Sequence, residues 1–211
     1  MRRILAALLL LAALAVMLPA CTPRPPAVTE AEVFPAAKAL LEASKAVNLA
    51  FVGDGIPVKT GTAAVGDFYF PADEEWLTAN GIRTLDDLRA AAAAVYTPTV
   101  TAILYRKAFP TEGNRFYEYQ VRSVATGEGI LVLIAREPMF DWYRGITYEY
   151  LYDTMRLAAA TATSATVTVT VRVSKDGKSP MERELSLPLV LTENGWRCDK
   201  LTSVAYAEEL E

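Results

Sequence analysis

The pattern of apolar and polar residues changes its period near residue 115. Between residues 29 and 109, apolar residues recur every three or four positions, which is typical of helices with one buried face. From residue 116 onward, apolar and polar residues alternate, which is typical of strands with one buried face. Helices followed by a run of strands predict an α+β domain, because parallel α/β folds alternate the two elements along the chain.

The first helix is predicted between residue 29 and Gly53. Pro35 is expected in its first turn, where a missing backbone N–H does no harm. Gly53 is expected to end the helix, because glycine follows many helix C-termini.

Two more helices are predicted between residues 81 and 109. Thr84 should cap the first of them, with Asp87 three residues later in a capping-box arrangement. Thr97 and Pro98 should start the second, as cap and first helical residue. The residues expected on the buried faces of the three helices are Phe34, Ala37, Leu40, Leu41, Ser44, Val47, Phe51, Leu85, Leu88, Ala92, Val95, Val100, Ile103 and Leu104.

Six strands are predicted in the second half of the chain, and a short one is predicted near residues 67–70. Asp176-Gly177 and Asn194-Gly195 should form hairpin turns, since both dipeptides tolerate positive φ. We therefore expect helices packed on the concave side of one strongly curved antiparallel sheet of about five to six strands. The six candidates are residues 115–123, 129–137, 146–155, 164–174, 182–192 and 196–206.

The N-terminus resembles a lipoprotein signal peptide over residues 1–20. Two arginines precede an uncharged run, residues 4–17, which is shorter than the roughly 20 residues that a membrane-spanning helix needs. Leu18-Pro19-Ala20-Cys21 resembles a bacterial lipobox, although proline is unusual two residues before the cysteine. We predict cleavage before Cys21 and acylation of its thiol, which would anchor the protein to the outer face of the cell membrane. The alternative is an ordinary secreted protein in which Cys21 has no role.

The predicted domain boundaries follow from this N-terminus. Residues 21–32 would be the lipidated cysteine and a proline-rich tether. Residues 33–206 would form a single α+β domain, and residues 207–211 an acidic tail.

Composition excludes several classes of function. The chain has no histidine, which excludes Ser-His-Asp and Cys-His catalysis and histidine-containing zinc sites. Its two cysteines, one of them Cys21, provide no disulfide framework. The formal net charge of −4 becomes more negative once Arg2 and Arg3 leave with the signal, and it argues against nucleic-acid binding. We expect a monomeric protein that is not an enzyme and has no cofactor or metal. The alternative is an enzyme that uses a pair of carboxylates, although the sequence places no such pair in one cleft.

Two clusters of residues are candidates for a binding site. Three tyrosines alternate along residues 148–152; such a stripe is usually core or a cross-strand ladder, and less often lines a pocket. Residues 140–144 form an aromatic and charged connection between strands, which could plug the end of the sheet or bind a partner. Cys198 is expected to be a buried, inert thiol. The candidates are Phe140, Asp141, Trp142, Tyr143, Arg144, Tyr148, Tyr150 and Tyr152.

The order of these features resembles a known family. The lipobox and one long helix are followed by "TLDDLRAAAAAVYTPTV" (residues 84–100), by a small sheet and by a final "ENGW-x-x-D" (residues 193–199). This arrangement is similar to the IseA-like DL-endopeptidase inhibitors and the related cone-shaped NTF2-like lipoproteins of Gram-positive bacteria. The similarity runs from Val33 to Tyr206 and includes no motif for contact residues, so none is transferred.

The resemblance implies inhibition without catalysis. Such proteins bind secreted peptidoglycan hydrolases that cut D-Glu to diaminopimelate bonds, and they block the active-site cleft. An acidic domain suits a basic cleft, because long-range charge raises the rate of association. The alternative is a non-catalytic NTF2-like lipoprotein that binds a small ligand or another envelope partner, with the tyrosine stripe lining its pocket.

Overall fold

The computed structural model describes residues 27–53, 55–58, 69–108, 119–123, 131–136, 146–175 and 179–203. Several predicted features lie outside these residues. They are the signal peptide, Cys21, the tether up to residue 26, the segment from Phe140 to Arg144, the turn at Asp176-Gly177 and the acidic tail.

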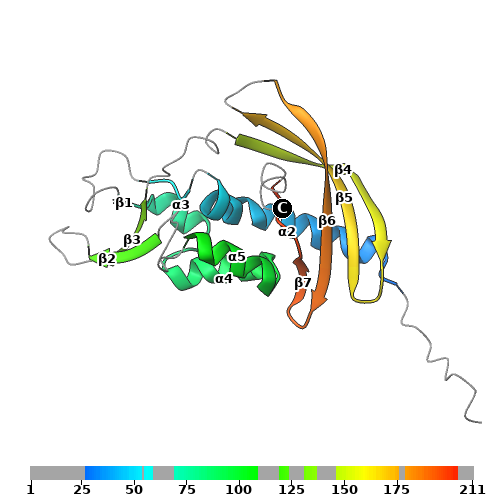
Figure 1. The fold of residues 1–211 in the computed structure, drawn as a ribbon, viewed down its shortest axis with the longest axis horizontal. Helices are drawn as coiled ribbons and strands as arrows, with labels where there is room; N and C mark the ends of the chain where they lie inside the picture. The colour runs from blue at the N-terminus through cyan, green and yellow to red at the C-terminus, as the bar shows by residue number, and fades with distance from the viewer. Residues whose placement is uncertain are drawn as a thin grey trace, which may run out of the picture.

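The fold is α+β, as predicted. Helices occupy most of the first half of the chain and antiparallel strands most of the second (Figure 1). The helices are α2 (Glu30–Val52), α3 (Glu74–Ala79), α4 (Leu85–Val95) and α5 (Pro98–Ala108). The strands are β1 (Tyr69–Pro71), β2 (Tyr119–Ser123), β3 (Leu131–Arg136), β4 (Ile146–Ala160), β5 (Ser164–Lys175), β6 (Met181–Thr192) and β7 (Gly195–Cys198).

The described strands form two sheets, whereas a single sheet of five to six strands was predicted. One sheet has three strands in the order β1-β3-β2, and the other has four in the order β4-β5-β6-β7. The expected short strand near residues 67–70 is β1, and it pairs with β3. Alternation reveals that a segment is a strand but not which strand it joins, and this is why β2 and β3 were assigned to the wrong sheet.

Gly53 ends α2 and Thr84 caps α4, as predicted. The short helix α3 was not predicted. In α4, the Asp87 backbone N–H donates to the Thr84 hydroxyl at 3.1 Å, while the Asp87 carboxylate accepts from the Thr84 N–H at 2.8 Å. Gly53 ends α2, and a Cβ at this position would lie 2.9 Å from the Leu49 backbone, so a larger residue would clash. Pro35 is not in the first turn, because α2 begins five residues earlier, at Glu30.

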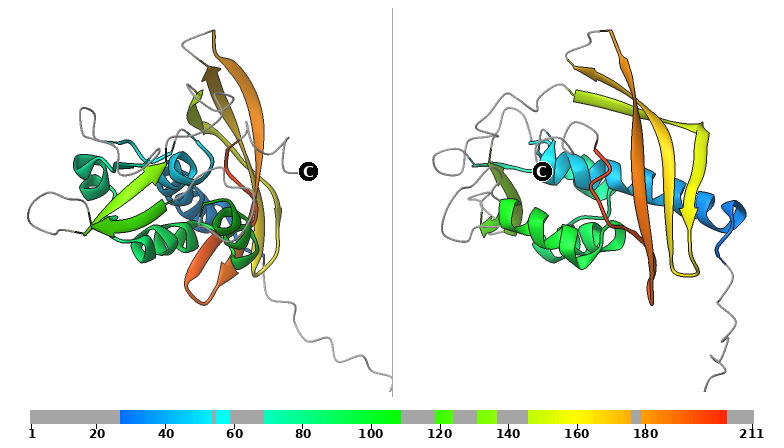
Figure 2. Two further views of the ribbon diagram at one scale, coloured as in Figure 1. Left: turned by 60° about the vertical axis from the view of Figure 1, so that its left-hand side comes forward. Right: turned by 45° about the vertical axis from the view of Figure 1, so that its right-hand side comes forward.

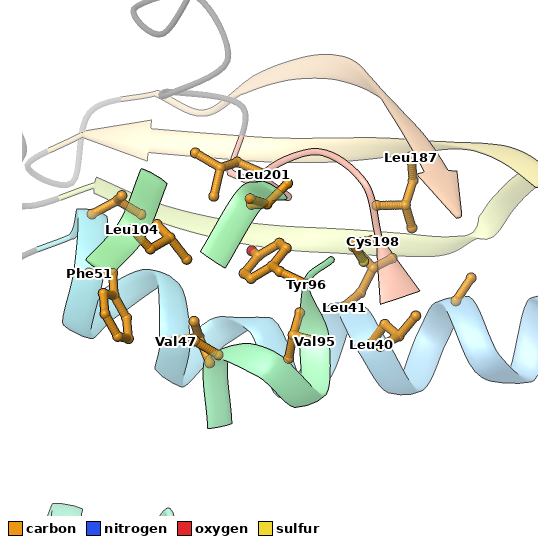
Figure 3. Packing of buried hydrophobic residues seen from close by; sticks show 14 of the residues in the cluster. Leu40, Leu41, Val47, Phe51, Val95, Tyr96, Leu104, Leu187, Cys198 and Leu201 are labelled. Carbon is orange, nitrogen blue, oxygen red and sulfur yellow. The ribbon is translucent and has the colours of Figure 1, made fainter. Parts of the chain in front are cut away.

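The long helix α2 lies on the concave side of the four-stranded sheet, with α4 and α5 beside it (Figure 2). In the core, Tyr96 and Cys198 meet Leu41 and Leu187 between the helices and the sheet (Figure 3). The helix positions predicted to face inward are buried, apart from three that are half-buried, namely Phe34, Leu85 and Ile103. Cys198 has no exposed surface, as predicted.

β4 runs to Ala160, beyond its predicted end at residue 155, and it contains a bulge. Leu151 pairs with Thr170 and Arg156 with Thr168, so the four residues 152–155 of β4 lie opposite the single residue Val169 of β5. The Thr154 hydroxyl accepts the Thr170 backbone N–H at 2.8 Å and donates to the Leu151 carbonyl at 2.6 Å. A side chain therefore replaces the missing ladder bond, and such bulges increase the local bend of a strand.

The last predicted strand is shorter than expected. The β6–β7 hairpin turns at Asn194-Gly195, where Gly195 has a φ of 92° that favours glycine. β7 ends at Cys198, and the chain leaves the sheet instead of continuing to residue 206. Leu201, Thr202 and Ser203 are then buried against the helices and the sheet.

Candidate functional site

The three tyrosines of β4 lie on the face of the sheet that α2 covers. Tyr150 is 4% exposed, and Tyr148 and Tyr152 pack beside it against the core. The ring centres of Tyr148 and Tyr150 are 5.4 Å apart, and those of Tyr150 and Tyr152 are 6.2 Å apart. The predicted stripe therefore exists as a run of neighbouring rings between β4 and α2.

Polar side chains from four separate segments meet beside Tyr150. We call this set, Ser44, Asn48, Tyr96, Tyr150 and Thr202, the buried hydroxyl network. The Tyr96 hydroxyl donates to the Asn48 side-chain oxygen at 2.5 Å, and the Asn48 amide donates to the Thr202 hydroxyl at 2.6 Å. The Thr202 hydroxyl lies 2.8 Å from the Ser44 hydroxyl, which donates to the Leu41 carbonyl at 2.7 Å.

The tyrosine hydroxyls join the same network. The Tyr150 hydroxyl lies 3.4 Å from the Ser44 hydroxyl and donates to the Thr202 carbonyl at 3.3 Å. The Tyr148 hydroxyl accepts from the Asn48 amide at 3.3 Å. Each buried polar group thus has a partner within the protein, which avoids the free-energy cost of an unpaired buried donor or acceptor. The network links α2, the end of α4, β4 and the C-terminal segment.

Burial determines the protonation of these groups. It raises the pKa of Tyr96, Tyr148 and Tyr150 above the ordinary tyrosine value, because the charged phenolate would lose its hydration. Burial also raises the pKa of the Cys198 thiol to about 12. The hydroxyls are therefore neutral hydrogen-bonding groups near neutral pH, and the thiol is not a nucleophile there, because the nucleophilic form is the thiolate.

Tyr152 marks the solvent-facing end of the stripe. Its hydroxyl donates to the Glu42 carboxylate, and Lys45 forms an ion pair with the same carboxylate at 2.7 Å. These hydrogen bonds, that from Lys45 above all, lower the pKa of Glu42. The Lys38 ammonium lies 4.9 Å from the centre of the Tyr152 ring. Two lysines and one glutamate of α2 thus border the tyrosine stripe where it reaches solvent.

The tether and the segment holding Phe140, Asp141, Trp142, Tyr143 and Arg144 join the domain at different ends. The Val28 backbone N–H donates to the Thr161 carbonyl at 3.0 Å, which places the start of α2 at the β4–β5 turn. The candidate segment connects Arg136 of the small sheet to Ile146, at the far end of β4. Figure 1 shows the small sheet and the start of α2 at opposite ends of the molecule.

An open hollow of about 660 Å³ lies away from the tyrosines, along α3. It is lined by Asp73, Glu74, Glu75, Thr78 and Ala79. Glu74 and Glu75 are exposed, and Asp73 caps α3 by accepting the Trp76 N–H at 2.9 Å. Among the described residues, no group of three or more acidic or cysteine side chains is placed to hold a metal ion. None of the described helices is long and apolar enough to cross a membrane.

Sequence reasoning missed the buried hydroxyl network, although one signal for it was present. Ser44 and Asn48 lie one helical turn apart among the apolar residues of α2, where polar side chains need buried partners. Tyr96 gave no such signal, since it lies at the junction of two predicted helices. Thr202 was predicted within a strand, residues 196–206, but β7 ends at Cys198 and Thr202 lies beyond it. Comparisons with protein-family models, with curated proteins and with solved structures each found no match.

Proposed function

We propose that this protein is anchored by a lipid to the outer face of the cell membrane. There it would bind secreted cell-wall DL-endopeptidases and inhibit or regulate them. Cys21 would carry the lipid, and the segment from Phe140 to Arg144 would contact the enzyme. The curved sheet, with helices on its concave side, would correspond to the cone-shaped fold of the NTF2-like lipoproteins.

The separation of the two ends of the domain supports this proposal most directly. Val28 is attached at the β4–β5 turn. Of the residues that flank the candidate segment, Arg136 ends β3 in the small sheet, and Ile146 begins β4 at the opposite end of that strand from the turn. A protein tethered at one end would therefore present Trp142 and its neighbours away from the membrane, where a secreted enzyme could reach them. Trp, Tyr and Arg are the residues most enriched at binding hot spots.

The buried hydroxyl network favours partner binding over small-ligand binding. A ligand pocket lined by the tyrosine stripe would need hydroxyls that are free to bond the ligand. The hydroxyls of Tyr148, Tyr150 and Tyr152 instead contact Asn48, Ser44, Thr202 and Glu42 of the same chain. We therefore assign the tyrosine stripe to stability and assign binding to the surface.

Inhibition of a purified DL-endopeptidase by the full-length protein in mild detergent tests the proposal. We expect near-stoichiometric inhibition that weakens as salt is added, because added salt screens the attraction between opposite charges. Trp142→Ala should weaken binding by about 2 kcal/mol or more. Glu193→Ala, in the exposed β6–β7 turn on the tethered side, is the matched control and should leave inhibition unchanged. Full hydrolysis at excess protein, across several such enzymes, would contradict the proposal.

The anchor is tested separately. Cys21→Ala should move the protein from the membrane pellet to the soluble fraction, because no thiol remains to accept the lipid. A variant that stays in the pellet would refute the anchor without bearing on inhibition.

A further inference from the structure

The strand β6 is paired along its whole length on one side but only at its end on the other. β5 pairs with β6 from Met181 to Val190, whereas β7 pairs with it only from Leu189 to Thr192. Figure 1 shows β7 beside the lower part of β6 alone. On the side of β7, no described strand pairs with Glu182, Glu184 or Ser186, so we call these three residues the free edge of β6.

Two hydrogen bonds establish which backbone groups face outward along the free edge. The Leu191 N–H donates to Thr163, on the side of β5, and the Pro188 carbonyl accepts from Asp199, on the opposite side. Backbone groups of successive residues in a strand point to opposite edges. Glu182, Glu184 and Ser186 therefore direct both their N–H and their C=O groups away from β5.

The side chains along this part of β6 alternate between the two faces of the sheet. Glu182, Glu184 and Ser186 are exposed on the outer face of the sheet, whereas Leu185 and Leu187 are buried on the inner face. An added strand would extend both faces. Its inner residues would lie beside the two leucines and its outer residues beside the glutamates, since cross-strand neighbours lie about 5 Å apart.

The charges select the kind of strand that fits. Glu182 pairs with Arg172 at 3.0 Å, on the side of β5, while the Glu184 carboxylate has no ion pair among the described residues. Opposite charges across a pair of strands are favourable and like charges are not. A lysine or arginine opposite Glu184, with apolar residues facing inward, is the complementary pattern.

Two other occupants fit less well. A second copy paired antiparallel about Glu184 would place that glutamate opposite itself. The tail of this chain carries Glu208, Glu209 and Glu211, which would repeat the same repulsion. We propose that the free edge of β6 captures an extended segment of a partner protein, with alternating apolar and basic residues, by adding it as a fifth strand.

The position of the free edge suits such a partner. β6 begins at Met181, opposite Val173, next to the end of β5 that pairs with Ile146 of β4. The edge therefore lies in the half of the sheet remote from the tethered turn. The competing explanation is that the charged residues only protect the edge from aggregation, as they do in many sheets.

The experiment uses the full-length protein in detergent and a capped peptide of about seven residues that alternates valine and lysine. We expect binding in fluorescence anisotropy, with slower hydrogen exchange at the amides of Glu182, Glu184 and Ser186. Ser186→Pro removes one of these amides and should weaken binding at least tenfold, whereas Ser186→Ala keeps the amide and should not. Glu184→Lys should reverse the preference toward a peptide that alternates valine and glutamate.

A modified peptide makes the test independent of any folding defect in the proline variant. N-methylation of alternate peptide amides blocks strand pairing but keeps the charge. When the methylated amides are those on the peptide edge that pairs with β6, methylation should abolish binding to the unaltered protein. Binding that survives both N-methylation registers and Ser186→Pro would be simple charge attraction, and it would overturn the proposal. Self-association that Ser186→Pro abolishes would also overturn it, since the occupant would then be a second copy. The inference does not depend on the partner being a DL-endopeptidase, so a failed inhibition assay leaves it standing.

Discussion

The two faces of the four-stranded sheet use polar side chains in opposite ways. On the inner face, neutral hydroxyl and amide groups are buried and bonded to one another, from Ser44 through Thr202 to Tyr96. On the outer face, Arg172 bridges Glu149 and Glu182 at 2.9 and 3.0 Å, with the three side chains 40% to 64% exposed. Buried hydrogen bonds are costly to break, whereas exposed ion pairs contribute little. The buried hydrogen bonds at the inner face should therefore contribute to stability, whereas the ion pairs on the outer face can be substituted at little cost in stability.

The largest contrast should come from two leucines of the same strand. Leu187 is fully buried, and Leu187→Ala should lower the free energy of unfolding by about 2–5 kcal/mol, through lost burial and the cavity it leaves. Leu191, which is 40% exposed, is the matched control, and Leu191→Ala should cost far less. Chemical denaturation of both variants measures the difference. Equal effects would mean that the sheet does not pack on α2 as described.

Removal of the central amide tests the inner face next. Asn48→Ala leaves the Tyr96 and Thr202 hydroxyls without their shortest bonds, and it should lower the unfolding free energy by about 1–3 kcal/mol. Asn80→Ala, at the exposed end of α3, is the control and should change stability much less. A stability unchanged by Asn48→Ala would show that the network contributes nothing to the fold.

Alkaline pH should weaken the inner face specifically. The folded-state pKa of Cys198 is raised to about 12, above the unfolded value near 8.5, so the folded state retains a proton that the unfolded chain releases. Stability should be complete below about pH 8.5 and fall as pH rises toward 12, by up to about 1.4 kcal/mol per pH unit from this thiol. Tyr96 and Tyr150 add to the loss above about pH 10, since burial raises the pKa of each. Cys198→Ala should flatten the decline between pH 8.5 and 10 in unfolding titrations; an unchanged slope would contradict this assignment.

The smallest effect is expected on the outer face. Arg172→Ala removes two exposed ion pairs, and it should change stability by less than about 1 kcal/mol. The difference should shrink further in high salt, because screening weakens surface pairs. Thermal unfolding at two salt concentrations checks this, and a loss comparable to that of Asn48→Ala would erase the proposed contrast between the faces.

Local features of this fold were accessible from the sequence, and long-range ones were not. Capping at Thr84, the turn at Gly195 and the burial of Cys198 follow from local patterns and were confirmed. The division into two sheets was missed, because strand pairing depends on contacts between distant segments. The bulge at Thr154 was missed too, since the hydroxyl within it accepts the N–H of Thr170 on the neighbouring strand, a contact between strands that alternation does not reveal. The candidate segment around Trp142 remains a prediction.

The bond between Val28 and Thr161 limits how far this protein could search. If Cys21 carries the proposed lipid, only seven residue steps would separate the anchor from Val28, a tether of at most about 25 Å when fully stretched. Under the proposed function, any enzyme that it bound would therefore have to come within a thin layer just above the lipid headgroups. Inserting residues into the tether would let the domain reach farther from the membrane. The same domain would then sample a larger volume, so its effective concentration near the membrane would fall.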